Sequence, residues 1–138
     1  MKKKILILAG GFSREREISL ITAKAVYREI KKKYKTKICE PDGNFVKILR
    51  KFKPDVVFNA LHGRYGEDGY VQAILESEKI KYTHSGVLAS SIAIDKEISK
   101  KIFTKNNILT PKYFKFKFEN AINKKKLISK VQNTLGFP

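Results

Sequence analysis

Hydrophobic positions along this chain fall into two kinds of pattern that take turns. Short apolar or alternating runs predict β-strands, at residues 4–9, 35–40, 56–61 and 79–83. Between them, apolar residues recur every three or four positions and predict helices, at residues 18–32, 45–52 and 70–78. Because strands and helices alternate, we expect an α/β fold with a three-layer, mostly parallel sheet and flanking helices.

The first predicted helix carries a stripe of large apolar side chains. We expect the face that covers the sheet to consist of Ile18, Ile21, Ala25 and Ile30, with Leu20 and Val26 beside it. Ser19 lies near the start of this helix and is a candidate cap or first-turn residue.

The pattern changes near residue 95, where we expect a second unit to begin. Residues 85–93 predict a short helix of small side chains, and residues 95–106 predict a more charged one. Aromatic and basic residues then alternate at 113–118, which favours a half-buried strand, and a last helix is predicted at 124–134. The expected domains are therefore residues 1–95 and residues 96–138, the second of which is incomplete.

Composition excludes several classes of protein. With 138 residues and 42% hydrophobic content, the chain suits a globular core rather than a disordered one. No apolar run approaches the roughly 20 residues that a membrane helix needs, so we expect no membrane span. The single Cys39 excludes an internal disulfide and a cysteine metal cluster, which fits a cytoplasmic protein.

A formal net charge of +17 raises the possibility of nucleic-acid binding. The charge is spread, however: residues 1–95 hold 19 basic and 11 acidic side chains, and residues 96–138 hold 11 and 2. Of the 30 basic residues only five are arginine, the side chain that bidentate phosphate and base contacts favour. We therefore expect no specific nucleic-acid partner.

The densest cluster of polar and glycine residues follows the strand predicted at 56–61. Residues 62–73 contain a histidine, an arginine, two carboxylates and three glycines, at the strand end where open α/β sheets bind ligands. A glycine pair, Gly10 and Gly11, follows the first strand and lets the chain pass close to a ligand. It lacks the Gly-x-Gly-x-x-Gly spacing of dinucleotide-binding loops. The alternative reading of residues 62–73 is a glycine-rich turn with solvated charges.

Three segments together resemble the D-alanine–D-alanine ligases. Residues 9–19 resemble that family's first loop, with two glycines before Glu-Arg-Glu-Val-Ser, and residues 62–73 resemble its His-Gly signature. Residues 82–91, followed by Asp95 and Lys96, are similar to a Tyr-Thr-Gly-Ser-Gly-Val segment and an Asp-Lys pair, although His84 replaces the first glycine. Members of the family run to roughly twice the length of this chain.

The resemblance implies a pre-ATP-grasp, Rossmann-like domain followed by the start of an α+β ATP-grasp domain. The implied reaction joins two D-alanines for peptidoglycan precursors: ATP phosphorylates the first carboxylate, and the second amine attacks the acyl phosphate. It also implies ATP and Mg2+ as cofactors, a cytoplasmic location and a homodimer. The family's metal-binding carboxylates fall beyond Pro138, so we expect no metal ligands here and an inactive chain when alone.

The resemblance also assigns roles to individual residues. Glu15 matches the glutamate that binds the ammonium of the first D-alanine, His62 matches a histidine near its carboxylate, and Lys96 matches a lysine that reaches the ATP phosphates. Residues expected to support the substrate site are Gly10, Gly11, Ser19, Gly63, Arg64, Glu67 and Asp68.

Simpler roles stay open for each of these side chains. Glu15 can merely complement a helix dipole, and Lys96 can be an ordinary solvated lysine. His62 can be bonded to Glu67 or Asp68. Two other functions also stay open: a non-catalytic flavodoxin-like module for an anionic metabolite, and a basic nucleic-acid binder.

Overall fold

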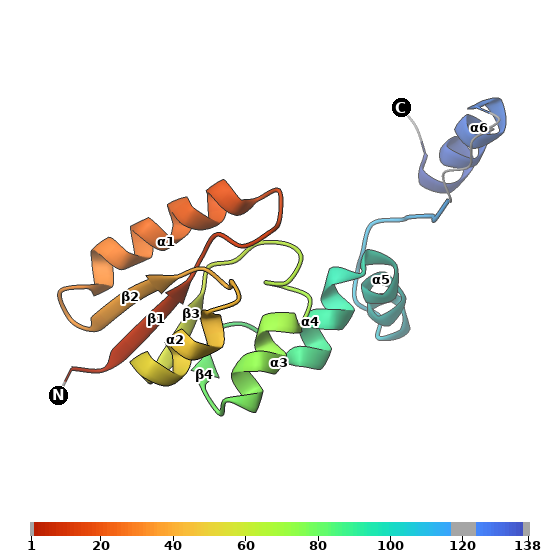
Figure 1. Ribbon diagram of the computed structural model, residues 1–138. Coiled ribbons are helices and arrows are strands. Elements are labelled where there is room, and N and C mark those ends of the chain that lie inside the picture. The colour runs from red at the N-terminus through yellow and green to blue at the C-terminus, as the bar shows by residue number, and fades with distance from the viewer. Residues whose placement is uncertain (1, 117–123, 137–138) are drawn as a thin grey trace. The chain divides into compact units, whose positions relative to one another are not determined.

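The computed structural model describes residues 2–116 and 124–136, and the chain divides into two compact units, Met1–Asp95 and Lys96–Pro138. The first unit is built on a sheet of four parallel strands in the order β2-β1-β3-β4 (Figure 1). The strands are β1 Lys4–Leu8, β2 Lys35–Cys39, β3 Val56–Asn59 and β4 Lys81–Tyr82. The predicted parallel α/β fold is confirmed.

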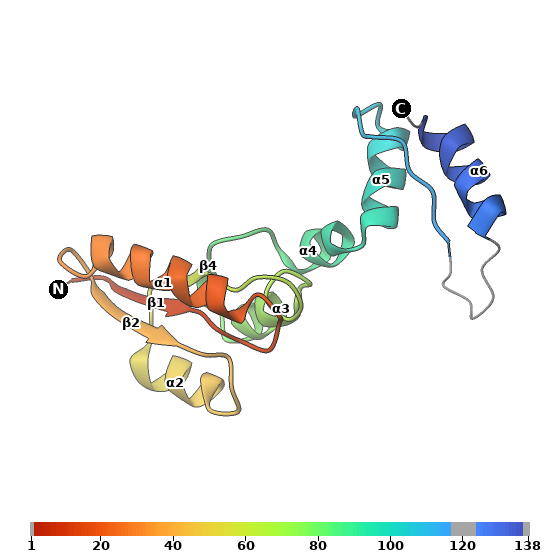
Figure 2. The ribbon, with the colours of Figure 1, turned by 90° about the horizontal axis from the view of Figure 1, so that it is seen from above.

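Helices cover both faces of the sheet and give three layers (Figures 1 and 2). On one face, Leu6 and Leu8 of β1 pack with residues of α2 (Phe45–Phe52) and α3 (Tyr70–Ser77). Ile7 lies between them in β1 and points to the opposite face, where it packs with Ala23 of α1 (Arg16–Ile30). Successive side chains of a strand alternate between faces, so an apolar run in β1 is what a sheet buried on both sides requires.

The inward face of α1 agrees with the predicted one at Leu20, Val26 and Ile30 and differs from it elsewhere. Ile18 and Ile21 are 54% and 63% exposed, and Ala25 is exposed as well. The residues that face the sheet are Ser19, Ala23, Leu20, Val26, Tyr27 and Ile30. Side-chain size explains the error, because the small Ser19 and Ala23 allow the helix backbone to approach the sheet closely. A prediction from hydrophobicity alone does not include this effect of size.

Several boundaries are also shorter than predicted. The strand expected at 56–61 ends at Asn59, and the one expected at 79–83 keeps only Lys81–Tyr82. The small-residue segment after β4 forms α4, Val87–Ile94. None of these changes moves the loops after β1 and β3 from the carboxyl edge of the sheet.

The second unit contains α5 (Lys96–Lys105) and α6 (Lys124–Leu135). The strand predicted at 113–118 is wrong for residues 113–116, which form neither helix nor strand, while residues 117 and 118 lie outside the described part. The described residues of this unit include no strand with which residues 113–116 could form backbone hydrogen bonds. Instead the aromatic rings contact ammonium groups: Lys100 Nζ lies 5.3 Å from the centre of the Tyr113 ring.

Two further features bear on the protein's class. Among the described helices none is long and apolar enough to cross a bilayer. Cys39 is buried, as expected for a small apolar side chain at this position, and burial is the main cause of the raised pKa of its thiol.

An ion pair links α2 to the end of α3 and should make stability depend on pH. Arg50 donates to both carboxylate oxygens of Glu78, at 2.6 and 3.0 Å, and these bonds lower the pKa of Glu78 below its ordinary 4.5. A carboxyl group whose pKa is lower in the folded state than in the unfolded state stabilises the fold at a pH above its unfolded pKa. This stabilisation is lost as the pH falls through the folded pKa. Arg50→Gln should therefore unfold at lower urea than wild type at pH 7, with a gap that closes below about pH 4.5.

The matched control for this prediction is Arg28→Gln on the exposed side of α1. Its urea midpoint should keep the same offset from wild type at pH 7, pH 5 and pH 3.5. If the offset of Arg50→Gln were equally constant across that range, the pair would not contribute to stability.

Candidate functional site

The loops that follow β1 and β3 meet at the carboxyl edge of the sheet. A Cβ placed on Gly63 would lie 2.9 Å from Glu15 Oε2, and one on Gly11 would lie 3.3 Å from Leu61 Cδ2. Gly10 and Gly11 have φ angles of +78° and +80°, a backbone shape that glycine adopts readily. Glycines at Gly11 and Gly63 therefore let the two loops approach each other, as their strand positions predict.

Ser19 holds the first of these loops to α1. Its hydroxyl accepts a hydrogen bond from the backbone N–H of Gly10 at 2.8 Å, and the side chain is fully buried. Ser19 thus acts as an anchor inside the helix and not as a helix cap.

Glu15 stands at the amino end of α1, immediately before its first helical residue. Its backbone N–H is bonded to Ser13 Oγ at 3.0 Å, and its side chain makes no capping hydrogen bond to the helix. The carboxylate is exposed beside Gly63. A helix amino terminus favours negative charge, so a carboxylate at this position suits the binding of a cation.

His62 is half-buried at the start of the second loop. Its Nδ1 lies 4.0 Å from Glu67 Oε1, while its Nε2 is buried without a hydrogen-bond partner within the described part of the chain. Buried polar atoms are normally bonded, and exceptions are frequent at functional sites. His62 therefore retains one ring nitrogen that the fold itself does not use.

Glu67 and Asp68 hold the backbone of the second loop. Glu67 Oε2 accepts from Gly63 N at 2.8 Å, and the two oxygens of Asp68 accept from Tyr65 N at 2.8 Å and Tyr70 N at 3.1 Å. The guanidinium of Arg64 instead lies over the Tyr65 ring, 5.2 Å from its centre. Both carboxylates therefore support the loop, and neither is paired with Arg64 in the described structure.

Three aromatic rings that the sequence analysis did not single out form a cluster over the same edge. The Phe12 and Tyr65 ring centres are 6.1 Å apart, and those of Tyr65 and Tyr70 are 5.1 Å apart, each pair edge to face. Phe12 is 74% exposed. The hint in the sequence was an apolar residue placed directly after a glycine pair, where a polar loop residue is usual.

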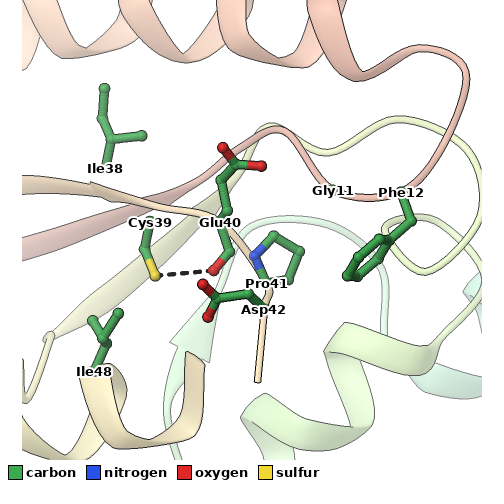
Figure 3. A pocket seen from close by; sticks show the side chains of 8 residues that line it. All are labelled: Gly11, Phe12, Ile38, Cys39, Glu40, Pro41, Asp42 and Ile48. Carbon is green, nitrogen blue, oxygen red and sulfur yellow. Dashed lines mark hydrogen bonds between the residues drawn. The ribbon is translucent and has the colours of Figure 1, made fainter. Parts of the chain in front are cut away.

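Two hollows lie beside this cluster and share Phe12, Pro41 and Asp42. One has a volume of about 470 Å³ and is also lined by Gly11, Cys39 and Glu40 (Figure 3). The other, of about 530 Å³, is also lined by Tyr65 and Tyr70. Neither is lined by Glu15 or His62, so both hollows flank the candidate pair rather than contain it.

The remaining predicted residue, Lys96, is the first residue of α5 and belongs to the second unit. For metals, the described ranges 2–116 and 124–136 contain no group of three histidine, cysteine, aspartate or glutamate side chains that could hold an ion.

Known proteins resemble this chain in sequence and in fold. The model of the D-ala D-ala ligase N-terminus matches residues 42–85. A D-alanine–D-alanine ligase of Pelagibacter ubique is 63% identical over all of this chain and 45% of its own length, and one of Carboxydothermus hydrogenoformans is 45% identical over 98% and 44%. The chain is a homologue of the N-terminal part of D-alanine–D-alanine ligases.

Solved structures agree with that assignment. The D-alanine–D-alanine ligase of Bacillus anthracis complexed with ATP superimposes with a TM-score of 0.72 at 30% identity, over 95% of this chain and 54% of that one. The resemblance seen in the three sequence segments is thus confirmed. This chain spans about half the length of the D-alanine–D-alanine ligases it matches.

The departure from the ligase motif at His84 has a structural account. The backbone here has a φ angle of +95°, in the left-handed region that suits the glycine of the D-alanine–D-alanine ligases. The chain keeps that conformation with a histidine, whose Nδ1 lies 3.1 Å from Asn59 Nδ2. His84 therefore adds a side-chain contact at a position whose backbone conformation favours glycine.

Gly66, a glycine of the ligase signature, is required for a steric reason that a mutation can test. A Cβ there would overlap Leu61 Cβ and lie 3.2 Å from the Leu61 carbonyl carbon. Overpacking of this kind costs about 1–3 kcal/mol, so Gly66→Ala should lower the free energy of unfolding by that amount.

The control is Gly43→Ala, since a Cβ on Gly43 would meet nothing within 4 Å. Urea unfolding should give Gly43→Ala a stability within about 0.5 kcal/mol of wild type. Equal stability of the two variants would mean that the loop shifts freely away from Leu61.

Proposed function

We propose that the intact protein containing this chain is an ATP-dependent D-alanine–D-alanine ligase, and that this chain supplies the site for the first D-alanine. The observation that carries the proposal is the convergence of two motif loops, which places Glu15 Oε2 against Gly63, next to His62. Homology to the N-terminal part of such ligases supports the same reaction.

The chemistry of these side chains suits the two ends of an amino acid. Glu15 is a carboxylate at a helix amino terminus and would bind the ammonium group of D-alanine. His62, when protonated, would donate a hydrogen bond from Nε2 to the substrate carboxylate. Gly10, Gly11 and Gly63 would let the backbone approach the substrate. Ser19, Glu67 and Asp68 would support the loops through their bonds to backbone N–H groups, and Arg64 would lie at the exposed surface of the second loop.

In the proposed reaction, a carboxylate oxygen of the first D-alanine attacks the γ-phosphorus of ATP and ADP leaves. The amine of the second D-alanine then attacks the carbonyl carbon of the acyl phosphate, and inorganic phosphate leaves with formation of the peptide bond. This chain's part is to hold the first substrate in place, since positioning lowers the barrier of both steps.

ATP and its metal would be held mainly by other parts of the protein. Lys96 would contact the ATP phosphates. It belongs to the second unit, residues 96–138, which we interpret as the start of the ATP-grasp domain. Residues 1–95 would be the N-terminal substrate-binding domain. Mg2+ would neutralise charge on the phosphates, but the described residues do not fit a metal site.

The family further supports a cytoplasmic location, a role in peptidoglycan precursor synthesis and a homodimeric assembly. The spread of the +17 charge over both halves of the chain supports the absence of a specific nucleic-acid partner.

The test is an assay of the full-length protein with D-alanine, ATP and Mg2+, followed by mass spectrometry for the dipeptide and a coupled assay for ADP. Formation of D-alanyl-D-alanine with one ADP per peptide bond is the expected result. Binding of D-alanine without release of ADP would instead favour a non-catalytic binding module.

A further inference from the structure

Two buried side-chain amides converge on one backbone oxygen beneath the second motif loop. Asn59 Nδ2 and Gln72 Nε2 each donate to the Gly66 carbonyl oxygen at 2.8 Å. Asn59 is 3% exposed and Gln72 is fully buried. A carbonyl oxygen has two lone pairs, so these two bonds use its full capacity.

The orientation of the Asn59 amide follows from its other bonds. The backbone N–H of Leu61 can only donate, and it lies 3.1 Å from Asn59 Oδ1, so Oδ1 is the acceptor and Nδ2 faces Gly66. The backbone N–H of Asn59 also donates to Thr83 Oγ1 at 3.0 Å. Asn59 thus fixes the loop from the end of β3, and Gln72 fixes it from α3.

Hydrogen bonds within the loop, and one approach of 4.0 Å between Glu67 and His62, connect the two amides to His62. The residue after Gly66 is Glu67, whose backbone N–H donates to Gly63 O at 2.9 Å. The Glu67 carboxylate returns to Gly63 N at 2.8 Å and presents its other oxygen 4.0 Å from His62 Nδ1. A displacement of the Gly66 carbonyl would therefore move Glu67 and, with it, the group that faces the His62 ring.

We propose that Asn59 and Gln72 are positioning residues that orient His62 through the carbonyl of Gly66. This inference rests on the proposed role of His62 in binding the first D-alanine. Neither amide reaches the loop surface where a substrate would bind, so both act through the loop.

Gln72→Met separates positioning from stability. Gln72 Oε1 is buried without a partner within the described part of the chain, so methionine removes one hydrogen bond and one unpaired oxygen together. Such an exchange is close to neutral for folding, because Gly66 O keeps its bond from Asn59. We expect an unchanged Tm, displaced His62 ring signals in NMR spectra of the full-length protein, and a KM for D-alanine raised about tenfold with the KM for ATP unchanged.

The matched control is Gln132→Met, the same exchange at an exposed position of α6, which should leave His62 signals and both KM values at wild-type values. Unchanged His62 signals and an unchanged D-alanine KM in Gln72→Met would overturn the proposal. So would an equal loss for D-alanine and ATP with a lower Tm, since that pattern means general damage. If the protein proved not to use D-alanine, the His62 signals alone would decide, which keeps this inference distinguishable from the proposed function.

Gln72→Glu provides a second test if the methionine variant does not fold. A protonated glutamic acid can donate to Gly66 O as the amide does, whereas the ionised form cannot. The His62 signals, and the ratio of variant to wild-type KM for D-alanine, should therefore match wild type at low pH and diverge as pH rises through the pKa of the new side chain. A difference from wild type that stays constant with pH would count against positioning by this bond.

Discussion

The 138-residue chain, purified alone, should form no dipeptide and release no ADP from ATP above the rate of a no-enzyme blank. Phosphoryl transfer depends on positioning of the nucleotide and on neutralisation of its charge. The described residues hold no metal-binding group, and the D-alanine–D-alanine ligases that match the chain are about twice as long. A coupled ADP assay at millimolar D-alanine and ATP measures this directly.

The control is the full-length protein under identical conditions, which should form the dipeptide and release ADP. Reproducible activity of the short chain that disappears with His62→Gln would place the whole catalytic machinery within 138 residues. It would contradict the proposal that ATP and its metal are held mainly by other parts of the protein.

In the full-length protein, Glu15→Gln should raise the KM for D-alanine at the first site by tenfold or more and leave the KM for ATP nearly unchanged. The substitution keeps the side-chain shape and removes the charge that would face the ammonium group. A hydrogen bond to a charged group contributes about 1.5–3 kcal/mol, which corresponds to at least that factor. Steady-state kinetics with D-alanine and ATP varied separately provide the measurement.

Glu17→Gln is the matched control, because Glu17 is an exposed glutamate in the first turn of the same helix. It should behave as wild type. His62→Gln should also impair use of D-alanine, with a flatter pH dependence if the imidazolium is the working form. Wild-type D-alanine kinetics in both Glu15→Gln and His62→Gln would mean that these side chains are structural.

The sheet and the meeting of its two loops could be predicted because they depend on chain-wide regularities. Parallel strands end at one edge, so the loops that begin at Gly10 and His62 could be expected on the same edge once the alternation of strands and helices was recognised. The face of α1 could not be predicted in the same way. Two apolar stripes fit its helical period, and the choice depended on how closely Ser19 and Ala23 let the helix approach the sheet.

The residues that shape the candidate site were harder to find than those exposed in it. Asn59 lies in an apolar strand run and Gln72 lies next to Val71 on a buried helix face, so each was a polar residue in an apolar setting. That mismatch was the available signal, since a buried amide needs partners. Its partners are backbone groups such as the Gly66 carbonyl, and the sequence does not show which backbone group lies within reach.

A loop whose shape is held by its own buried bonds leaves its outward side chains free to vary. Glu67 and Asp68 bind backbone N–H groups, whereas Arg64 is exposed and lies only over the ring of its neighbour Tyr65. In a saturation library of residues 62–70, Arg64 should therefore tolerate substitution, whereas Gly66 should not. Laboratory evolution toward a different first amino acid could accordingly introduce diversity at Arg64 without loss of the scaffold that presents it.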